Sequence, residues 1–332
     1  MLPLPVFQHH SPSSLAEAVI LMAELGDRAR LIAGGTDLLP NMKHGIVEPE
    51  HLVSLREVTE LNGVQHDDAH IVIGAMTRLV DIAKHPAVLE HAPALAEATG
   101  QVGGPHHRRM GTLGGNLCLD TRCVYINQTY FWREALGFCL KKDGTVCHVV
   151  KSGKKCVAAA SNDSAPALMV LGAEIDLLSP RGKRTLSAND FYTTDGIYNQ
   201  SRKLDEIVTH IRIPILADRV SAFEKLRRRG AIDYPLLNCA IRIDYKGSRI
   251  DEFDMVVSAL AARPKRVKAA ARLAIGKTPS DALTKQLAEV AFKNCKPLTN
   301  LDNDADWRRE MIRVLVRKAL ERARPPGASQ AT

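Results

Sequence analysis

The stretch Ala33-Gly34-Gly35-Thr36-Asp37-Leu38 joins a short predicted strand, residues 29–33, to a short segment of helical character, residues 38–43. A second paired-glycine stretch, Thr112-Leu113-Gly114-Gly115-Asn116, comes later in the chain. Paired glycines let the backbone approach a ligand closely, and successive inward-pointing N–H groups form an anion-binding nest. One such pair alone would indicate only a turn. Two of them, each flanked by hydroxyl or amide side chains, favour a site for a phosphate-bearing ligand.

The segments around these loops predict a mixed α/β part followed by an α+β part, with a boundary near residues 214–219. The expected strands are 29–33, 51–55, 70–74, 173–178, 207–213, 222–228, 238–245 and 252–260. The expected helices are 14–26, 38–43, 77–85, 87–100, 165–171, 264–275, 279–293 and 306–323.

The bulk composition is that of a globular protein of two or three domains: 332 residues, 45% of them hydrophobic. No stretch approaches the roughly 20 apolar residues of a membrane span, and the N-terminus lacks the pattern of a secretory signal. We therefore expect a cytoplasmic protein without a membrane partner. The net charge of +8 comes without a nucleic-acid motif and with only 5% aromatic residues, so we expect no nucleic-acid partner. A basic face for an acidic protein or an anionic ligand explains the charge as well.

Seven cysteines occur, at positions 118, 123, 139, 147, 156, 239 and 295, and five of them fall within residues 118–156. An odd count without a secretion signal argues against a disulfide framework, so this cluster indicates a metal. No C-x-x-C pair is present, which makes a structural zinc site the poorer fit. An iron–sulfur cluster is less demanding in spacing, and metal binding would supply the folding energy of an irregular loop. For Cys239 and Cys295, which fall in a predicted strand and a predicted helix, a place in the core is expected.

The two glycine stretches, in this order, resemble the FAD-binding subunits of the molybdenum hydroxylases, a family that includes xanthine dehydrogenase, carbon monoxide dehydrogenase and 4-hydroxybenzoyl-CoA reductase. Asn162-Asp163-Ser164-Ala165-Pro166-Ala167-Leu168 and Phe223-Glu224-Lys225-Leu226 resemble two further family segments. The resemblance implies that Asp163 contacts the sugar-like part of the flavin and that Lys225 and Val102 lie near FAD. The FAD-binding residues that it implies are Leu31, Ile32, Ala33, Gly34, Gly35, Thr36, Asp37, Leu38, Val102, Thr112, Leu113, Gly114, Gly115, Asn116, Asp163 and Lys225.

The resemblance also implies an α+β fold. It has a two-part FAD-binding domain of the PCMH type at residues 1–217, with subdomains at about 1–56 and 57–217 and an iron–sulfur insertion at 117–160. A C-terminal α+β domain with a three-stranded antiparallel sheet and helices would follow at 218–325, and a disordered tail at 326–332. No acid–base pair or nucleophile stands out as catalytic, so the expected chemistry is electron transfer by cofactors in an oxidoreductase subunit.

The cysteine insertion resembles that of the beta subunits of 4-hydroxybenzoyl-CoA reductases. This resemblance implies that Cys123, Cys139, Cys147 and Cys156 hold a 4Fe–4S cluster and that Cys118 is a small buried side chain. It also implies a dimer of heterotrimers with a large molybdopterin subunit and a small 2Fe–2S subunit, which removes the phenolic hydroxyl of 4-hydroxybenzoyl-CoA with electrons from ferredoxin. Five lysines of the loop, at positions 141, 142, 151, 154 and 155, would offset the cluster charge or dock an acidic ferredoxin, or would simply be solvated.

Two alternatives remain at this point. The first is an oxidative hydroxylase of a purine or another heteroaromatic compound, because the substrate would bind another subunit. The second is a non-catalytic four-cysteine zinc protein that binds nucleic acid through its positive charge.

Overall fold

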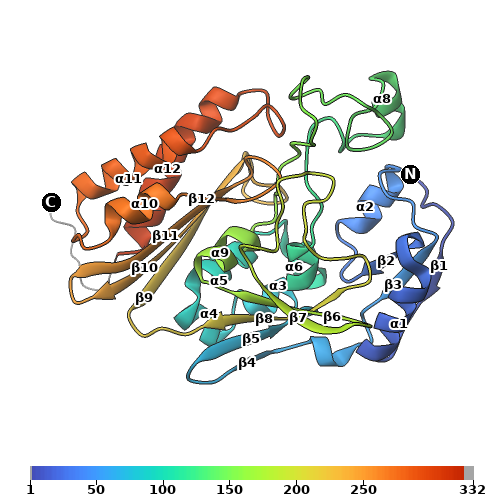
Figure 1. Ribbon diagram of the computed structural model, residues 1–332, viewed down its shortest axis with the longest axis horizontal. Helices are drawn as coiled ribbons and strands as arrows, with labels where there is room; N and C mark the ends of the chain where they lie inside the picture. Colours follow the sequence, from blue (N-terminus) through green and yellow to red (C-terminus); the bar gives the residue numbers. More distant parts are fainter. Residues whose placement is uncertain (1, 325–332) are drawn as a thin grey trace.

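The computed structural model of the chain describes residues 2–324, so the predicted tail at 326–332 lies outside the described residues. Three sheets follow one another along the chain (Figure 1). The first is parallel, with strand order β1-β3-β2. Its elements are β1 (Gln8–His10), α1 (Leu15–Leu25), β2 (Ala29–Ile32), α2 (Leu38–Lys43) and β3 (His51–Ser54).

The helix α1 forms as the sequence predicts. The Ser14 hydroxyl accepts a hydrogen bond from the Glu17 amide at 3.2 Å, which satisfies one of the free N–H groups of the first turn. Leu15, Val19 and Met22 are buried on one face and join the core of the first sheet. The helix ends at a glycine cap in the left-handed region, Gly26. The first sheet is therefore covered by α1, and its loops after β2 face the rest of the molecule (Figure 1).

The second sheet is antiparallel, with order β4-β5-β8-β6-β7. Its strands are β4 (Val64–His66), β5 (His70–Gly74), β6 (Glu174–Ser179), β7 (Gly182–Ser187) and β8 (Ile207–Pro214). The helices that lie between β5 and β6 in the sequence are α3 (Leu79–Ile82), α4 (Pro86–His91), α5 (Pro93–Gly100), α6 (Pro105–Met110), α7 (Leu113–Leu117), α8 (Tyr130–Ala135) and α9 (Ser164–Val170). Two of these helices, α5 and α9, also pack against strands of the third sheet, so the two halves share one core.

Two predicted helices are wrong in detail. The Thr77 hydroxyl does not cap a helix but donates to the Gly63 carbonyl at 2.9 Å, and α3 begins only at Leu79. The helix predicted at 87–100 is split into α4 and α5 because Pro93 cannot continue the α4 hydrogen-bond pattern.

The third sheet is antiparallel, with order β12-β11-β10-β9, from β9 (Arg219–Leu226), β10 (Leu237–Lys246), β11 (Arg249–Ser258) and β12 (Lys265–Arg266). It has four strands, whereas three were predicted, because β12 is two residues long and too short to show a period. The helices α10 (Lys268–Ala274), α11 (Asp281–Asn294) and α12 (Ala305–Arg322) follow it. Cys239 and Cys295 are buried in its core, as predicted. We propose residues 1–217 and 218–325 as the domain limits.

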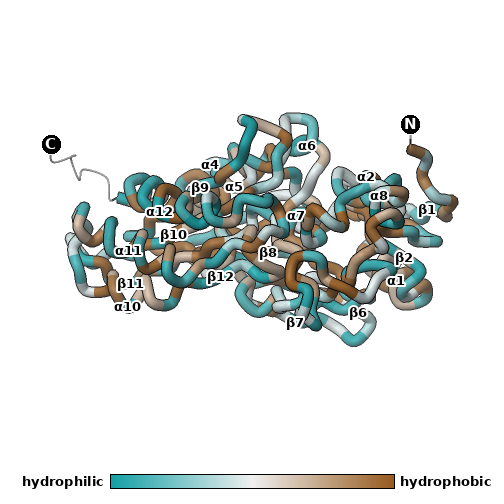
Figure 2. The backbone as a smooth tube through the Cα atoms, turned by 90° about the horizontal axis from the view of Figure 1, so that it is seen from above, coloured by the Kyte–Doolittle hydropathy of each residue, from teal (hydrophilic) through white to brown (hydrophobic). Residues whose placement is uncertain are grey.

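The cysteine insertion projects from the molecule beside the first sheet, and its helix α8 lies next to α2 in both views (Figures 1 and 2). The buried side chain of Arg133 fastens it there. Its guanidinium donates to the carbonyls of His44 and Gly45, at 2.9 and 3.0 Å, just beyond the end of α2. Insertion and first sheet are thus held together by a charged group that bonds to backbone oxygen.

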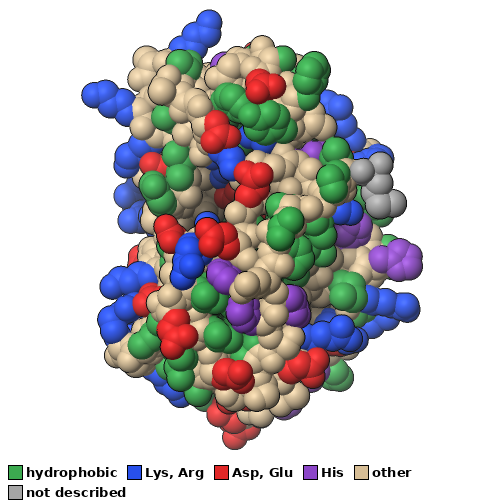
Figure 3. Space-filling model, turned by 90° about the vertical axis from the view of Figure 1, so that its right-hand side faces the viewer, with side chains coloured by type: hydrophobic (Ala, Val, Ile, Leu, Met, Phe, Trp, Pro, Cys, Tyr) green, Lys and Arg blue, Asp and Glu red, His purple; other side chains and the backbone are tan. Residues whose placement is uncertain are grey.

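On the face drawn in Figure 3, acidic and basic side chains lie interspersed. Among the described residues, no helix is both long and apolar enough to cross a bilayer.

Candidate functional site

A cavity of about 730 Å³ lies between the first and second sheets and the loop after β9. Its volume falls within the range of roughly 300–1,000 Å³ that is typical of small-molecule sites. The loop after β2, the segment around α7 and the loop before β8 contribute to its wall. Both predicted glycine stretches therefore meet at one cavity, although they are far apart in the sequence.

The first glycine loop presents free backbone N–H groups to this cavity. Gly35 adopts a positive φ of 69°, which L-residues avoid. Among the residues that the structure describes, the amides of residues 34–38 find no acceptor in the chain. All five of these residues line the cavity. Successive unpaired amides on one wall match the needs of a bound phosphate.

The second glycine loop differs, because its amides bond to the chain itself. Leu113 and Gly114 donate to the carbonyls of Thr77 and Ala75, at 3.1 and 2.8 Å. Gly115 donates to the Thr112 hydroxyl at 3.1 Å. A Cβ on Gly114 would lie 2.9 Å from the Ala75 oxygen, so this glycine is required by packing. The expected nest of free amides is present in the first loop only, and the second contributes shape and side chains.

A buried ion pair stands behind the second loop. The Lys225 ammonium donates to one Asp163 carboxylate oxygen at 2.6 Å, and the Asn238 amide donates to the other at 3.0 Å. Burial raises the pKa of Asp163, and the Lys225 charge opposes that rise. Asp163 lines the cavity whereas Lys225 does not. Lys225 is therefore placed to hold the aspartate in position.

Most of the predicted FAD-binding residues line the cavity. Those that do are Leu31, Ala33, Gly34, Gly35, Thr36, Asp37, Leu38, Val102, Thr112, Gly114, Gly115, Asn116 and Asp163. Ile32, Leu113 and Lys225 lie outside the lining.

Two arginines of the cavity were not predicted from the sequence. Arg30 and Arg202 line the cavity together. Burial lowers the pKa of Arg30, and the positive charge of Arg202 lowers it further. Two cations on one wall favour an anionic ligand. Cys118, which was predicted to be buried, is only partly buried and lines this cavity, where desolvation raises the pKa of its thiol. The alternation of strand β2 could have suggested Arg30, but nothing local indicates Arg202.

A second, narrow pocket brings together the four predicted cluster ligands. Cys123, Cys139, Cys147 and Cys156 line it, and all four are buried. Burial raises the pKa of the Cys123 thiol to about 12, and the three other sulfurs add to the rise. Burial also raises the pKa of Cys156, which the nearby Lys141 charge opposes. Cys118 is absent from this pocket, as the prediction requires.

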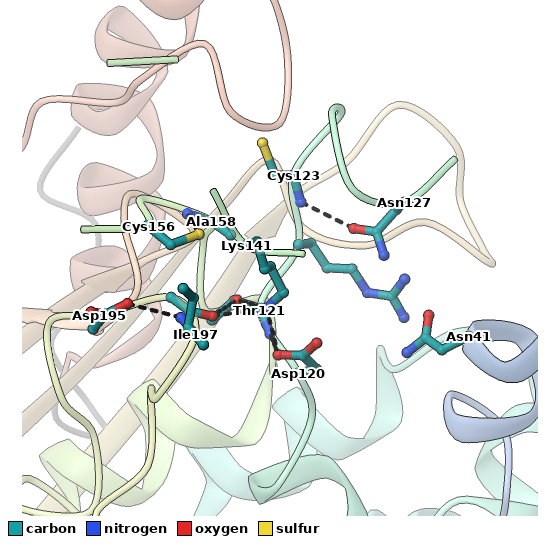
Figure 4. Close-up of polar contacts among 12 residues, drawn as sticks. Asn41, Asp120, Thr121, Cys123, Asn127, Lys141, Cys156, Ala158, Asp195 and Ile197 are labelled. Atoms are coloured by element: carbon teal, nitrogen blue, oxygen red, sulfur yellow. Dashed lines mark hydrogen bonds and ion pairs between the residues drawn. The ribbon is translucent and has the colours of Figure 1, made fainter. Parts of the chain in front are cut away.

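The two sites share a wall. Ile46, Val47 and Ile197 line the large cavity and also pack in one apolar cluster with Cys123, Cys139 and Cys156. The backbone connects them as well, because Asp120 and Arg122 line the cavity and the next residue, Cys123, lines the pocket. Figure 4 shows this segment with Cys123 and Cys156. A group bound in one site would therefore lie beside a group bound in the other.

Three side chains that line the cavity connect three segments of the chain. The Arg122 guanidinium pairs with Asp37 of the first glycine loop and stacks on the Tyr234 ring, 4.2 Å from its centroid. The Tyr234 hydroxyl donates to Asp37 at 3.0 Å. The glycine loop, the cysteine insertion and the loop after β9 are thus joined at one point.

The unpaired amides and the two arginines of this cavity suit a phosphate-bearing ligand, and comparison with known families places the chain in the class of flavoproteins. Residues 5–216 match the family described as "FAD binding domain in molybdopterin dehydrogenase". Residues 221–323 match "CO dehydrogenase flavoprotein C-terminal domain". The chain belongs to the FAD-binding medium subunits of the molybdenum hydroxylase family.

Individual relatives agree over almost the full length. The carbon monoxide dehydrogenase medium chain of Hydrogenophaga pseudoflava is 29% identical, and the match covers 97% of this chain and 98% of that one. A putative xanthine dehydrogenase FAD-binding subunit of Escherichia coli is 24% identical, with 95% of each chain covered. The solved structure of the Hydrogenophaga pseudoflava carbon monoxide dehydrogenase that lacks the Mo-pyranopterin moiety superposes with a TM-score of 0.79, at 29% identity, over 97% of this chain and 98% of that one. The predicted fold class is confirmed, and the flavoprotein interpretation is favoured over the zinc-protein alternative.

Proposed function

We propose that this chain is the electron-transfer subunit of a molybdenum oxidoreductase, with FAD in the large cavity and a 4Fe–4S cluster in the cysteine pocket. One observation carries the proposal: four buried thiols from an irregular loop converge on one pocket, and that pocket shares an apolar wall with the flavin cavity. A relay between a one-electron carrier and a flavin needs this proximity.

The cavity residues fit FAD. The free amides of residues 34–38 suit the pyrophosphate, and the neighbouring Arg30 and Arg202 offset its negative charge. Asp163, held by Lys225, offers a carboxylate to the hydroxyl groups of the sugar-like part. Bound FAD would supply exchange of one or two electrons. The protein contributes orientation and exclusion of water, and no side chain here is proposed as catalytic.

The pocket residues fit a cluster better than a single ion. Among the described residues, no group of three or more His, Cys, Asp or Glu side chains is close enough to hold one metal ion. A zinc site requires ligands that converge on one atom. The thiolates of a 4Fe–4S cluster hold separate irons and stand wider apart. The four thiols, gathered in one pocket without single-ion geometry, support the cluster.

We propose that the remaining cofactors of the enzyme lie on partner subunits. The similar proteins carry the names medium chain, medium subunit or FAD-binding subunit, which indicates division among several chains. A large molybdopterin-binding subunit and a small 2Fe–2S subunit, assembled as a dimer of heterotrimers in the cytoplasm, would complete the relay. Ferredoxin is the proposed external partner, for which the exposed Lys151, Lys154 and Lys155 beside the cysteine pocket offer complementary charge.

Two reactions are candidates for the assembled enzyme. The names of the similar proteins, among them nicotine 6-hydroxylase and xanthine dehydrogenase, favour oxidative hydroxylation, with electrons leaving through FAD. The cysteine pocket favours the opposite direction, because a cluster at the entry of the chain suits a low-potential donor. The reductive reaction would remove the phenolic hydroxyl of 4-hydroxybenzoyl-CoA as water, with consumption of an electron pair and protons.

Metal and flavin analysis of anaerobically purified protein tests the proposal. We expect FAD together with about four irons per chain, and an EPR signal of a reduced cluster after addition of dithionite. Zinc in place of iron, or FAD without any metal, would contradict the cluster. Turnover of 4-hydroxybenzoyl-CoA by the whole complex, and not of a purine or nicotine, decides between the two reactions.

A further inference from the structure

Lys141 is a buried cation between the two proposed cofactor sites. It lies in the sequence between Cys139 and Cys147, and its side chain is only 8% exposed. The side chain lines the cysteine pocket. Its ammonium points away from solvent and toward the segment that leads to the flavin cavity (Figure 4).

Three oxygens surround this ammonium. They belong to the Asp120 carboxylate at 2.7 Å, the Thr121 hydroxyl at 2.6 Å and the Gly196 carbonyl at 2.8 Å. A lysine ammonium has three donors and no acceptor, so this set uses its full capacity. The geometry is therefore that of a charged lysine in a prepared site.

The adjacent lysine provides a contrast. Lys142 approaches Glu48 at 3.5 Å, is 26% exposed and does not line the cysteine pocket. The two residues carry the same charge one position apart, but only Lys141 places it between the sites. Asp120, whose carboxylate accepts from Lys141, lines the flavin cavity and is 37% exposed, so water screens its charge more than that of the lysine.

We propose that the Lys141 ammonium raises the reduction potential of the cluster in the cysteine pocket and thereby sets the driving force of its electron exchange with the flavin. This inference rests on the proposed function, which places the cluster there. Reduction adds a negative charge to a group already held by four thiolates, and a buried cation stabilises that added charge. A charge at Lys142 is more exposed and acts more weakly.

The competing explanation is a purely structural role. Lys141 would then only tie the cysteine loop to Asp120 and Thr121, and its loss would cost iron or stability without moving a potential. Two variants separate these roles by sign. Lys141→Met removes the positive charge, whereas Asp120→Asn removes the negative charge and leaves the ammonium. Both substitutions would weaken a purely structural contact. An electrostatic effect, in contrast, would shift the midpoint potential of the cluster in opposite directions in the two variants.

The experiment is an EPR-monitored redox titration of the cluster in the whole complex, with iron and FAD measured on each sample. We expect Lys141→Met to shift the midpoint potential to more negative values, Asp120→Asn to shift it to more positive values, and Lys142→Met to stay close to the wild type. Lys141→Arg, which keeps the charge, should remain nearer the wild type than Lys141→Met does.

An unchanged potential in Lys141→Met with its iron retained overturns the inference. If Lys141→Met loses its cluster, the Asp120→Asn variant tests the inference instead. An unchanged or more negative midpoint potential in Asp120→Asn also overturns the inference. A wild-type protein that holds no iron removes the proposed function together with this inference. If the wild-type protein holds the cluster but neither substitution shifts its midpoint potential, this inference alone is refuted.

Discussion

The flavin cavity and the cysteine pocket offer different chemical groups to a ligand. The cavity offers backbone amides in a loop fixed between strand β2 and helix α2. The pocket offers side-chain thiols from an insertion whose regular structure, within the described residues, is one short helix and isolated bridges. The cavity is thus formed by the fold, whereas in the proposed function the cluster would hold the irregular loop of the pocket together.

This difference predicts that the two sites can be lost separately. Damage to the pocket should remove iron and loosen residues 117–160 while FAD stays. Damage to the glycine loop should remove FAD while iron stays. The following changes test that separation, from the largest expected effect to the smallest.

Replacement of any one pocket cysteine should have the largest effect. Alanine at Cys123, Cys139, Cys147 or Cys156 removes one of four thiolates, and iron should fall below about four atoms per chain. FAD should remain bound, and limited proteolysis should cut the insertion faster. Cys118→Ala is the matched control, because Cys118 lies outside the pocket and should leave iron unchanged. Loss of iron from Cys118→Ala but not from Cys123→Ala would refute the ligand set.

The second largest effect is expected from loss of Lys225, the buried partner of Asp163. Lys225→Met leaves the carboxylate unpaired in the interior, which costs about 3–5 kcal/mol of stability. Thermal unfolding should show a lower Tm, and FAD content should fall. The double variant Lys225→Met/Asp163→Asn should recover part of the stability, because it has no buried charge. A single variant that unfolds like the wild type would show that the pair is not buried in solution.

The two glycine loops should then fail in different ways. Gly35→Val places a side chain at positive φ, a strain of about 1–2 kcal/mol, and disturbs the free amides, so FAD should be lost from folded protein that keeps iron. Gly247→Val carries comparable strain at a distant hairpin and should keep FAD. Gly114→Val would press against Ala75 and should mainly lower the Tm. Full FAD occupancy in a folded Gly35→Val protein would contradict the role of the loop.

The smallest effect is expected at the mouth of the cavity. Tyr234→Phe removes the hydroxyl that donates to Asp37 and accepts from Arg122 but keeps the ring, and a net loss of about 1 kcal/mol should make FAD bind ~5-fold more weakly. Isothermal titration of FAD-free protein measures this, and iron content should not change. A loss of iron in this variant would show that the two sites are not separable.

Regular elements were predictable where the pattern repeats. Helix α2 and strand β5 have the predicted bounds, because the apolar spacing and the flanking glycines are local signals. The short strands β1, β4 and β12 were missed, since two or three residues cannot show a period, and β7 was missed because its six residues are mostly polar and none is buried. They form because a neighbouring strand offers unpaired backbone groups.

The sites were predictable to the extent that their residues carry motifs. The first glycine loop and the four cysteines could be named from the sequence, because each type has few other uses in such a pattern. Arg202 and Lys141 could not, since their importance arises from tertiary proximity to Arg30 and to the pocket. The different role of the second glycine loop also depends on tertiary contacts, namely acceptors at Ala75 and Thr77.

The relay itself is tested most directly by stopped-flow reduction of the flavin in the anaerobic complex, with reduced ferredoxin as donor. The wild type and Cys147→Ala, both with full FAD, should be compared. We predict rapid bleaching of the flavin absorbance in the wild type and a greatly slowed phase in the variant, because electrons would have lost the pocket beside the cavity. Equal rates in the two proteins would contradict an electron path through the cysteine pocket.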